Sequence, residues 1–150
     1  MPVNHFVLIF NLEQSNSIHE IVVDTYLHRL NSPLTCHVFG LLIEDGKIIE
    51  NYIDSKPKWM LKFEDGHQVI PENFQSYMLS QSYLKEVCKN PKQFEIVLSN
   101  PSDDWKEVIP HENLRPDTYH QFTELKSKGP FSHLLYMHFP NGGIHGLKVF

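Results

Sequence analysis

Short apolar runs rich in β-branched and aromatic residues, separated by polar turn residues, make up most of the chain. In the first run, His5 to Leu12, apolar side chains occupy both sets of alternating positions, which predicts a strand covered on both faces. Turn residues recur about every ten positions, a rhythm typical of antiparallel sandwiches and barrels. The other expected strands are 18–25, 34–43, 59–63, 93–99, 105–109, 119–125, 131–139 and 144–150.

One segment departs from this pattern and predicts a helix over residues 71–91. Pro71, Glu72 and Asn73 favour a helix start, and Pro91 favours its end. An apolar stripe at this spacing is typical of a helix packed on a core, with a partner groove as the alternative. The stripe consists of Phe74, Tyr77, Met78, Leu84, Val87 and Cys88.

Three glycine-containing turns predict tight hairpins. Asp45-Gly46 separates Leu42-Ile43 from Ile48-Ile49, and Asp65-Gly66 repeats the same signal. Pro140-Asn-Gly-Gly143 stands between the last two expected strands, and its glycines allow the positive φ that a short hairpin needs.

Composition narrows the class of protein without identifying it. The length of 150 residues suits one domain, and 41% hydrophobic with 21% charged residues argues against disorder. The net charge of −5, without a cluster of Lys or Arg, is unlike that of a nucleic-acid binder. There is no apolar run of about 18 residues for a membrane span and no visible secretory signal, so we expect the cytoplasm or nucleus. Cys36 and Cys88 are expected as buried free thiols.

Candidate chemistry is sparse. Ten histidines raise the question of a metal, but His133 and His138 are five residues apart and so point to opposite faces of one strand. No nucleophile elbow, phosphate-binding loop or zinc-binding helix is present, and we predict no metal site or cofactor. Asp24 is the acid of most interest, because it stands where a β-branched strand gives way to a loop. Such positions carry binding groups on rigid β scaffolds, although Asp also caps turns there.

Several segments resemble the repeat of the allantoicase family. Residues 5–12 are similar to the strand that precedes the family's binding loop, and 18–25 to its strand ending in V-D-T. In the loop that follows, Asn31 and Pro33 match the family pattern F-x-G-N-x-P, whereas Leu30 replaces the glycine.

The C-terminal half carries the more specific part of the resemblance. Residues 104–109 and 114–120 resemble the family's W-x-E-L segment and its later histidine. Residues 132–150 resemble T-H-V-R-L-x-x-Y-P-D-G-G-I-x-R-L-R-V-Y. The resemblance implies one mostly β domain over 1–150, an antiparallel β-sandwich of the galactose-binding-like jelly-roll type. Residues 44–103, with the one helix, would be an inserted segment.

Allantoicases hydrolyse allantoate to ureidoglycolate and urea in purine catabolism, and this chain departs from them where charge is needed. The aspartate of P-D-G-G is Asn141, and the expected arginines are Leu135, Gly146 and Lys148. Arginine is the usual bidentate partner of a carboxylate, so most of the substrate's expected partners are missing.

We therefore predict a non-catalytic allantoicase-like module that binds protein, either a separate partner or another copy in a homo-oligomer, and neither nucleic acid nor membrane. The binding residues that the resemblance implies are Asp24, Thr25, Arg29, Asn31 and Asn141.

The alternative is an allantoicase-type amidinohydrolase that acts on allantoate as part of an oligomer. In that reading Asp24 is a general base or metal-side carboxylate, His120 and His133 carry protons, and a divalent metal takes part. The fold name alone suggests a third reading, a carbohydrate-binding module.

Overall fold

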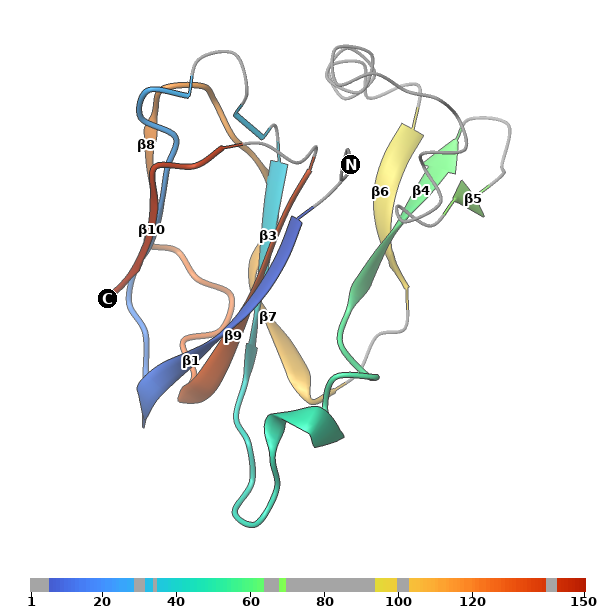
Figure 1. The fold of residues 1–150 in the computed structure, drawn as a ribbon, viewed down its shortest axis with the longest axis vertical. Coiled ribbons are helices and arrows are strands. Elements are labelled where there is room, and N and C mark those ends of the chain that lie inside the picture. Colours follow the sequence, from blue (N-terminus) through green and yellow to red (C-terminus); the bar gives the residue numbers. More distant parts are fainter. Residues whose placement is uncertain are drawn as a thin grey trace.

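Antiparallel strands account for nearly all regular structure in the computed structural model (Figure 1). The structure describes residues 6–28, 32–33, 35–63, 68–69, 94–99, 103–139 and 143–150. One short 3-10 turn, η1 (Ile49–Asn51), is the helical element within these ranges. The helix predicted over 71–91 lies outside the described residues.

The larger sheet has four strands in the order β1-β9-β3-β7. They are β1 (Phe6–Asn16), β9 (Phe131–Phe139), β3 (Thr35–Leu41) and β7 (Trp105–Asn113). All neighbours are antiparallel. Apolar and β-branched side chains on both faces suit the two central strands, β9 and β3, for burial.

The second sheet has three antiparallel strands in the order β10-β2-β8. They are β10 (Gly146–Val149), β2 (Ile21–Asp24) and β8 (Tyr119–Phe122). The two sheets pack face to face, because one core joins buried residues of both. Its members include Ile21, Val23, Val38, Ile109, Leu134 and Tyr136.

The four-stranded sheet is buried on its other face as well. Successive residues of a strand point to opposite faces, so Phe39 and its cross-strand neighbour Leu135 lie opposite the sandwich core. Both are buried, as are Leu41 and Met137 on the same face. Figure 1 shows a third sheet on this side, in the order β5-β4-β6. Its strands are β5 (Gln68–Val69), β4 (Lys58–Phe63) and β6 (Phe94–Ser99).

Mostly β structure in antiparallel sheets is therefore confirmed, whereas the jelly-roll topology itself stays a prediction. The expectation that the first strand is covered on both faces was wrong at Leu8, which is 40% exposed, whereas Phe10 and Leu12 pack against the core. β1 is an edge strand that pairs with β9 alone among the described strands. Cys36 is a buried free thiol as predicted, and Cys88 lies outside the described residues.

Two of the three predicted hairpins were wrong. Glu44 to Lys47 do form a turn, with Gly46 at φ +83°, but the chain then enters η1 instead of a returning strand. The strands on either side of residues 140–143 belong to different sheets, so this connection crosses the sandwich. The third hairpin is confirmed in its strands, since β4 and β5 pair antiparallel, although the turn between them lies outside the described residues.

Candidate functional site

Three connections meet at one end of the three-stranded sheet of the sandwich, β10-β2-β8, which is called the three-stranded sheet below. Asp24, the last residue of β2, pairs with Tyr119 at the start of β8 and with Gly146 at the start of β10. The residues that follow β2 are thereby placed beside those that precede the other two strands. Asp24 and Thr25, both predicted binding residues, lie in the middle of this end of the sheet.

Asp24 holds the first turn of the loop after β2. Its side chain is 7% exposed, and its Oδ1 accepts the backbone N–H of Tyr26 at 2.9 Å, as in an Asx turn. Its backbone carbonyl accepts the N–H of His145 at 2.6 Å, which ties the loop to the approach of β10. Because Val23 points into the sandwich core, the alternation places Asp24 on the outer face of the sheet.

Thr25 joins the loop to the approach of β8. It is fully buried, and its hydroxyl donates to the carbonyl oxygen of Arg115 at 2.6 Å while accepting the N–H of Thr118 at 2.9 Å. Its own backbone N–H donates to the carbonyl oxygen of Thr118 at 2.9 Å. One buried side chain therefore fixes two loops relative to each other.

Tyr26 and Leu27 follow Thr25 in this loop and are exposed to solvent. Their exposed fractions are 52% and 64%, and the neighbouring Tyr119 is also exposed. Leu27 has φ +67°, a left-handed conformation that is unfavourable for a branched apolar residue, and its N–H donates to Asp117 Oδ1 at 2.9 Å. Strain of this kind persists where the surroundings impose it, and it is concentrated at functional sites. The loop thus holds apolar side chains outward in a fixed geometry.

His120 lies one residue pair away from Asp24 along the β2–β8 ladder, and it points to the other face of the sheet. It pairs with the inward-pointing Val23, donates from Nδ1 to the Val23 carbonyl at 2.9 Å, and accepts the N–H of Arg115 at Nε2 at 2.8 Å. Burial lowers the pKa of His120, more than its hydrogen bond to Val23 raises it. The ring is therefore neutral near pH 7, and both of its nitrogens are engaged.

His133 lies at the opposite end of the sandwich. His133 is two residues from Phe131, which pairs with Asn16 at the end of β1. Close to this pair, the N–H of Ile18 donates to the carbonyl oxygen of Lys128, just before β2 begins. This is the end where β2 begins, whereas Asp24 is where β2 finishes (Figure 1). The structure therefore brings Asp24, Thr25 and His120 to one end and places His133 at the other.

Arg29, Asn31 and Asn141 lie outside the described residues, but a contact between their neighbours is described. A Cβ atom at Gly143 would overlap the ring of His28, so a larger residue there would require this side chain to move. The loop after β2 and the connection before β10 are therefore in direct contact.

The positions where the family carries arginine have diverged in different ways. Leu135 is fully buried on the face opposite the sandwich core, and Gly146 has open space around it. Lys148 keeps a positive charge, and its Nζ lies 5.5 Å from the centroid of the Tyr119 ring. A single cation therefore remains among these positions, beside the outer face that Asp24 occupies.

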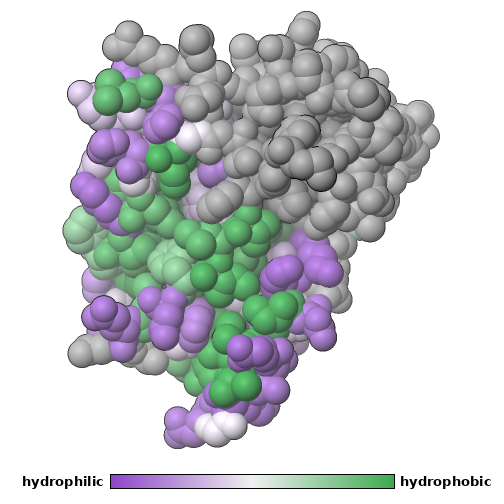
Figure 2. All heavy atoms as spheres, in the orientation of Figure 1, coloured by the Kyte–Doolittle hydropathy of each residue, from purple (hydrophilic) through white to green (hydrophobic). Residues whose placement is uncertain are grey.

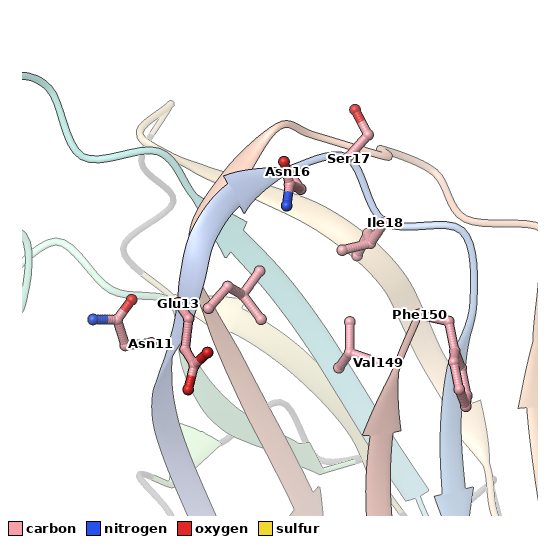
Figure 3. A pocket seen from close by; sticks show the side chains of 8 residues that line it. Asn11, Glu13, Asn16, Ser17, Ile18, Val149 and Phe150 are labelled. Atoms are coloured by element: carbon pink, nitrogen blue, oxygen red, sulfur yellow. The ribbon is translucent and has the colours of Figure 1, made fainter.

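Within the described ranges no three His, Cys, Asp or Glu side chains converge as metal ligands. No helix in the same ranges has the length and apolar character of a membrane span. A groove of about 470 Å³ is present, but it lies at the far end of the three-stranded sheet from Asp24, beside Ile18, Val149 and Phe150 (Figure 3).

A second buried histidine, His37, is part of a hydrogen-bond network on the four-stranded sheet, in which the ion pair is formed by Lys126 and Glu107. His37 Nε2 lies 2.7 Å from Glu107 Oε2, and Lys126 Nζ lies 2.6 Å from Glu107 Oε1. Burial lowers the pKa of His37 despite the neighbouring carboxylate, because the cation is disfavoured in the sheet interior.

Acid is expected to destabilise the fold through His37 and His120. Both have a pKa below the ordinary 6.5 when folded, so the unfolded chain binds more protons as the pH falls through that value. The stability they contribute is complete above pH 6.5 and is lost below it. We expect the free energy of unfolding to fall by about 1–3 kcal/mol between about pH 7 and pH 5, measured by urea denaturation. His120→Gln should flatten this dependence and the exposed His19→Gln should not; an equal slope in all three proteins would contradict the assignment.

Comparison with known proteins adds a family to this geometry. The family model of the allantoicase repeat matches residues 2–150, almost the whole chain. No solved structure matches the chain.

Proposed function

Because the chain belongs to the allantoicase family, we propose that it is a binding module of that family, which recognises another protein through the loops at the end of β2. The proposal concerns the site and its partner class. A role beside enzymes of purine catabolism is part of the same proposal, since it comes from the family alone.

The observation that carries the proposal is the conformation of the loop at Tyr26 and Leu27. The backbone N–H groups of Tyr26 and Leu27 donate to Asp24 Oδ1 and Asp117 Oδ1, which fixes the two residues in place, and Leu27 is kept in a backbone conformation that is costly for it. An exposed tyrosine on a pre-organised loop is typical of the anchors of protein interfaces, and the adjacent Leu27 adds apolar contact area beside it. A small charged substrate would need converging polar groups instead.

One observation favours the hydrolase as a second candidate. Asp24 is nearly buried, and its Oδ2 atom makes no hydrogen bond within the described part of the chain. It has the character of a base or a carboxylate ligand. Against this, His120 points to the opposite face with both ring nitrogens engaged, and His133 is at the other end of the sandwich. No acid–base pair is formed by these three residues.

The two candidates are distinguished by urea release from allantoate, measured with the folded chain with and without Mn²⁺. We expect no turnover, because Asp24 has no proton carrier on its own face among the predicted residues. Turnover that Asp24→Ala abolishes would contradict the binding module and support the hydrolase.

The same experiment has a binding arm that does not depend on loss of folding. Partners captured by the chain from a cell extract are quantified for the wild type, for Leu27→Gly and for the exposed control Ile48→Gly. Glycine accepts the positive φ of Leu27, so this variant should keep its loop and its stability while losing its apolar anchor. We expect capture to fall at least about tenfold for Leu27→Gly only. Equal capture by all three proteins would contradict the proposed surface.

A further inference from the structure

β1 differs from the other edges of the sandwich in having no protection against pairing. β8 and β10 are four residues long, and β7 carries Pro110 with several charges along its length. Short strands, proline and charge are the usual devices that stop edge strands from associating. β1 runs for 11 residues, and the stretch Phe6 to Leu12 has no proline and no charged side chain.

The side chains of β1 are also accessible. Leu8 is exposed, and Val7, Ile9 and Phe10 are half-buried although all four are apolar. Figure 2 shows hydrophobic surface on the face of the molecule that β1 crosses in Figure 1. Since β1 pairs only with β9 among the described strands, its second edge offers backbone groups for one more strand.

We propose that β1 is an interface between two copies of this chain, which pair their β1 strands antiparallel about a two-fold axis near Ile9. In this register Leu8 of one copy faces Phe10 of the other, and residue 6 faces Leu12. A two-fold contact requires a self-complementary surface, which a continuous uncharged apolar strand provides. The seven residues from Phe6 to Leu12 are centred on Ile9 and satisfy this condition.

If two copies associate, the absence of charged side chains between Phe6 and Leu12 favours this edge over the edges that carry carboxylates. Each copy has a net charge of −5, so association through a carboxylate-bearing surface would bring like charges together. The first carboxylate of β1 is Glu13, which lies beyond the uncharged stretch. The register with β9 is interrupted between Asn11 and Asn16, so the strand leaves its regular course at the end of the uncharged stretch.

A groove lies beside the end of this stretch. Its apolar lining residues are Leu12, Ile18, Val149 and Phe150, and its polar ones are Asn11, Glu13, Asn16 and Ser17 (Figure 3). Leu12 is both the last residue of the proposed pairing and a wall of this groove.

The proposed interface is small. Seven residues from each copy fall well short of the roughly 20–30 per side of a standard stable interface. We therefore expect a weak, reversible dimer. This surface is the edge of the four-stranded sheet, whereas the proposed partner-binding loop is at the end of the three-stranded sheet.

Sedimentation equilibrium over a concentration series tests the dimer. Leu8→Lys places two lysines close to the axis and should raise the dissociation constant at least about tenfold. Leu42→Lys is the matched control, because Leu42 is a leucine of similar exposure, 47%, outside any strand. A wild-type chain that is monomeric at about 500 µM would overturn the proposal, as would a dimer equally strong in Leu8→Lys.

The position of the axis has its own test. A two-fold axis at Ile9 brings the two copies of this residue directly opposite, within reach of a disulfide or a short bis-maleimide. Ile9→Cys should form a covalent dimer, and Leu42→Cys under the same conditions should not. If Ile9→Cys sediments as a dimer without cross-linking, the proposed strand pairing is wrong.

Discussion

Replacing Trp105 with alanine is expected to lower the free energy of unfolding by about 3–5 kcal/mol, a loss typical of a truncated buried tryptophan. Trp105 is 3% exposed, begins β7 and pairs with Leu41 of β3. Its Nε1–H donates to the carbonyl oxygen of Tyr52 at 3.2 Å. The side chain therefore connects the four-stranded sheet to the segment that leads into β4. Urea denaturation followed by circular dichroism measures the loss.

Two further variants separate packing from the hydrogen bond. Trp105→Phe keeps most of the buried area but removes the donor, and we expect a smaller loss of about 1–2 kcal/mol. Lys106→Ala, at the exposed neighbouring position, should change stability by less than about 0.5 kcal/mol. If Trp105→Ala costs no more than Lys106→Ala, the contact with Tyr52 does not hold the two parts of the chain together.

Thr25→Val is expected to cost about 2–4 kcal/mol although it preserves the shape of the side chain. The methyl group that replaces the hydroxyl leaves the Arg115 carbonyl and the Thr118 N–H without their partner in a fully buried position. Leaving buried polar groups unpaired is more costly than the net value of the bonds themselves. The same substitution should release the loop that carries Tyr26 and Leu27, so partner capture should fall together with stability.

Thr25→Ser is the informative companion, because it restores the hydroxyl and removes only a methyl group. We expect it to recover most of the stability, within about 1 kcal/mol of the wild type. Thr123→Val, at an exposed threonine, controls for the substitution itself. Equal losses for serine and valine at position 25 would mean that packing matters there and the hydrogen bonds do not.

The strands of the two sheets that form the sandwich could be predicted from the sequence, whereas the connections between these strands could not. β2 and β3 are continuous runs of apolar and β-branched residues, and their local pattern was sufficient. The turn at Asp45-Gly46 was also readable, but no hairpin follows it. The Ile48 N–H is satisfied locally by Asn51 Oδ1 at 3.0 Å, within the 3-10 turn that the chain adopts. Glycine-containing turns indicate a change of direction and do not indicate which sheet the chain enters next.

The candidate site was predictable to a similar degree. Asp24 and Thr25 were expected at a strand end, and they are there. His120 could not be placed from sequence, because its face depends on the register between β2 and β8, two strands about a hundred positions apart. The left-handed Leu27 gave no signal at all, since a leucine is not expected at such a position. A residue that violates a local preference is visible only when the surrounding hydrogen bonds are known.

The pairing pattern of the sheets also determines when the chain can fold during synthesis. β1 pairs with β9, β2 with β8 and β10, and β3 with β7 and β9, so every partner of the first three strands begins at residue 105 or later. At ordinary translation rates roughly 3–13 s pass between the appearance of β3 and that of β7, the first of these partners. During this interval three apolar strands wait without partners, while β4, β5 and β6 can begin to pair with one another as they appear. A nascent chain of this protein therefore depends on protection from aggregation until its last strands leave the ribosome.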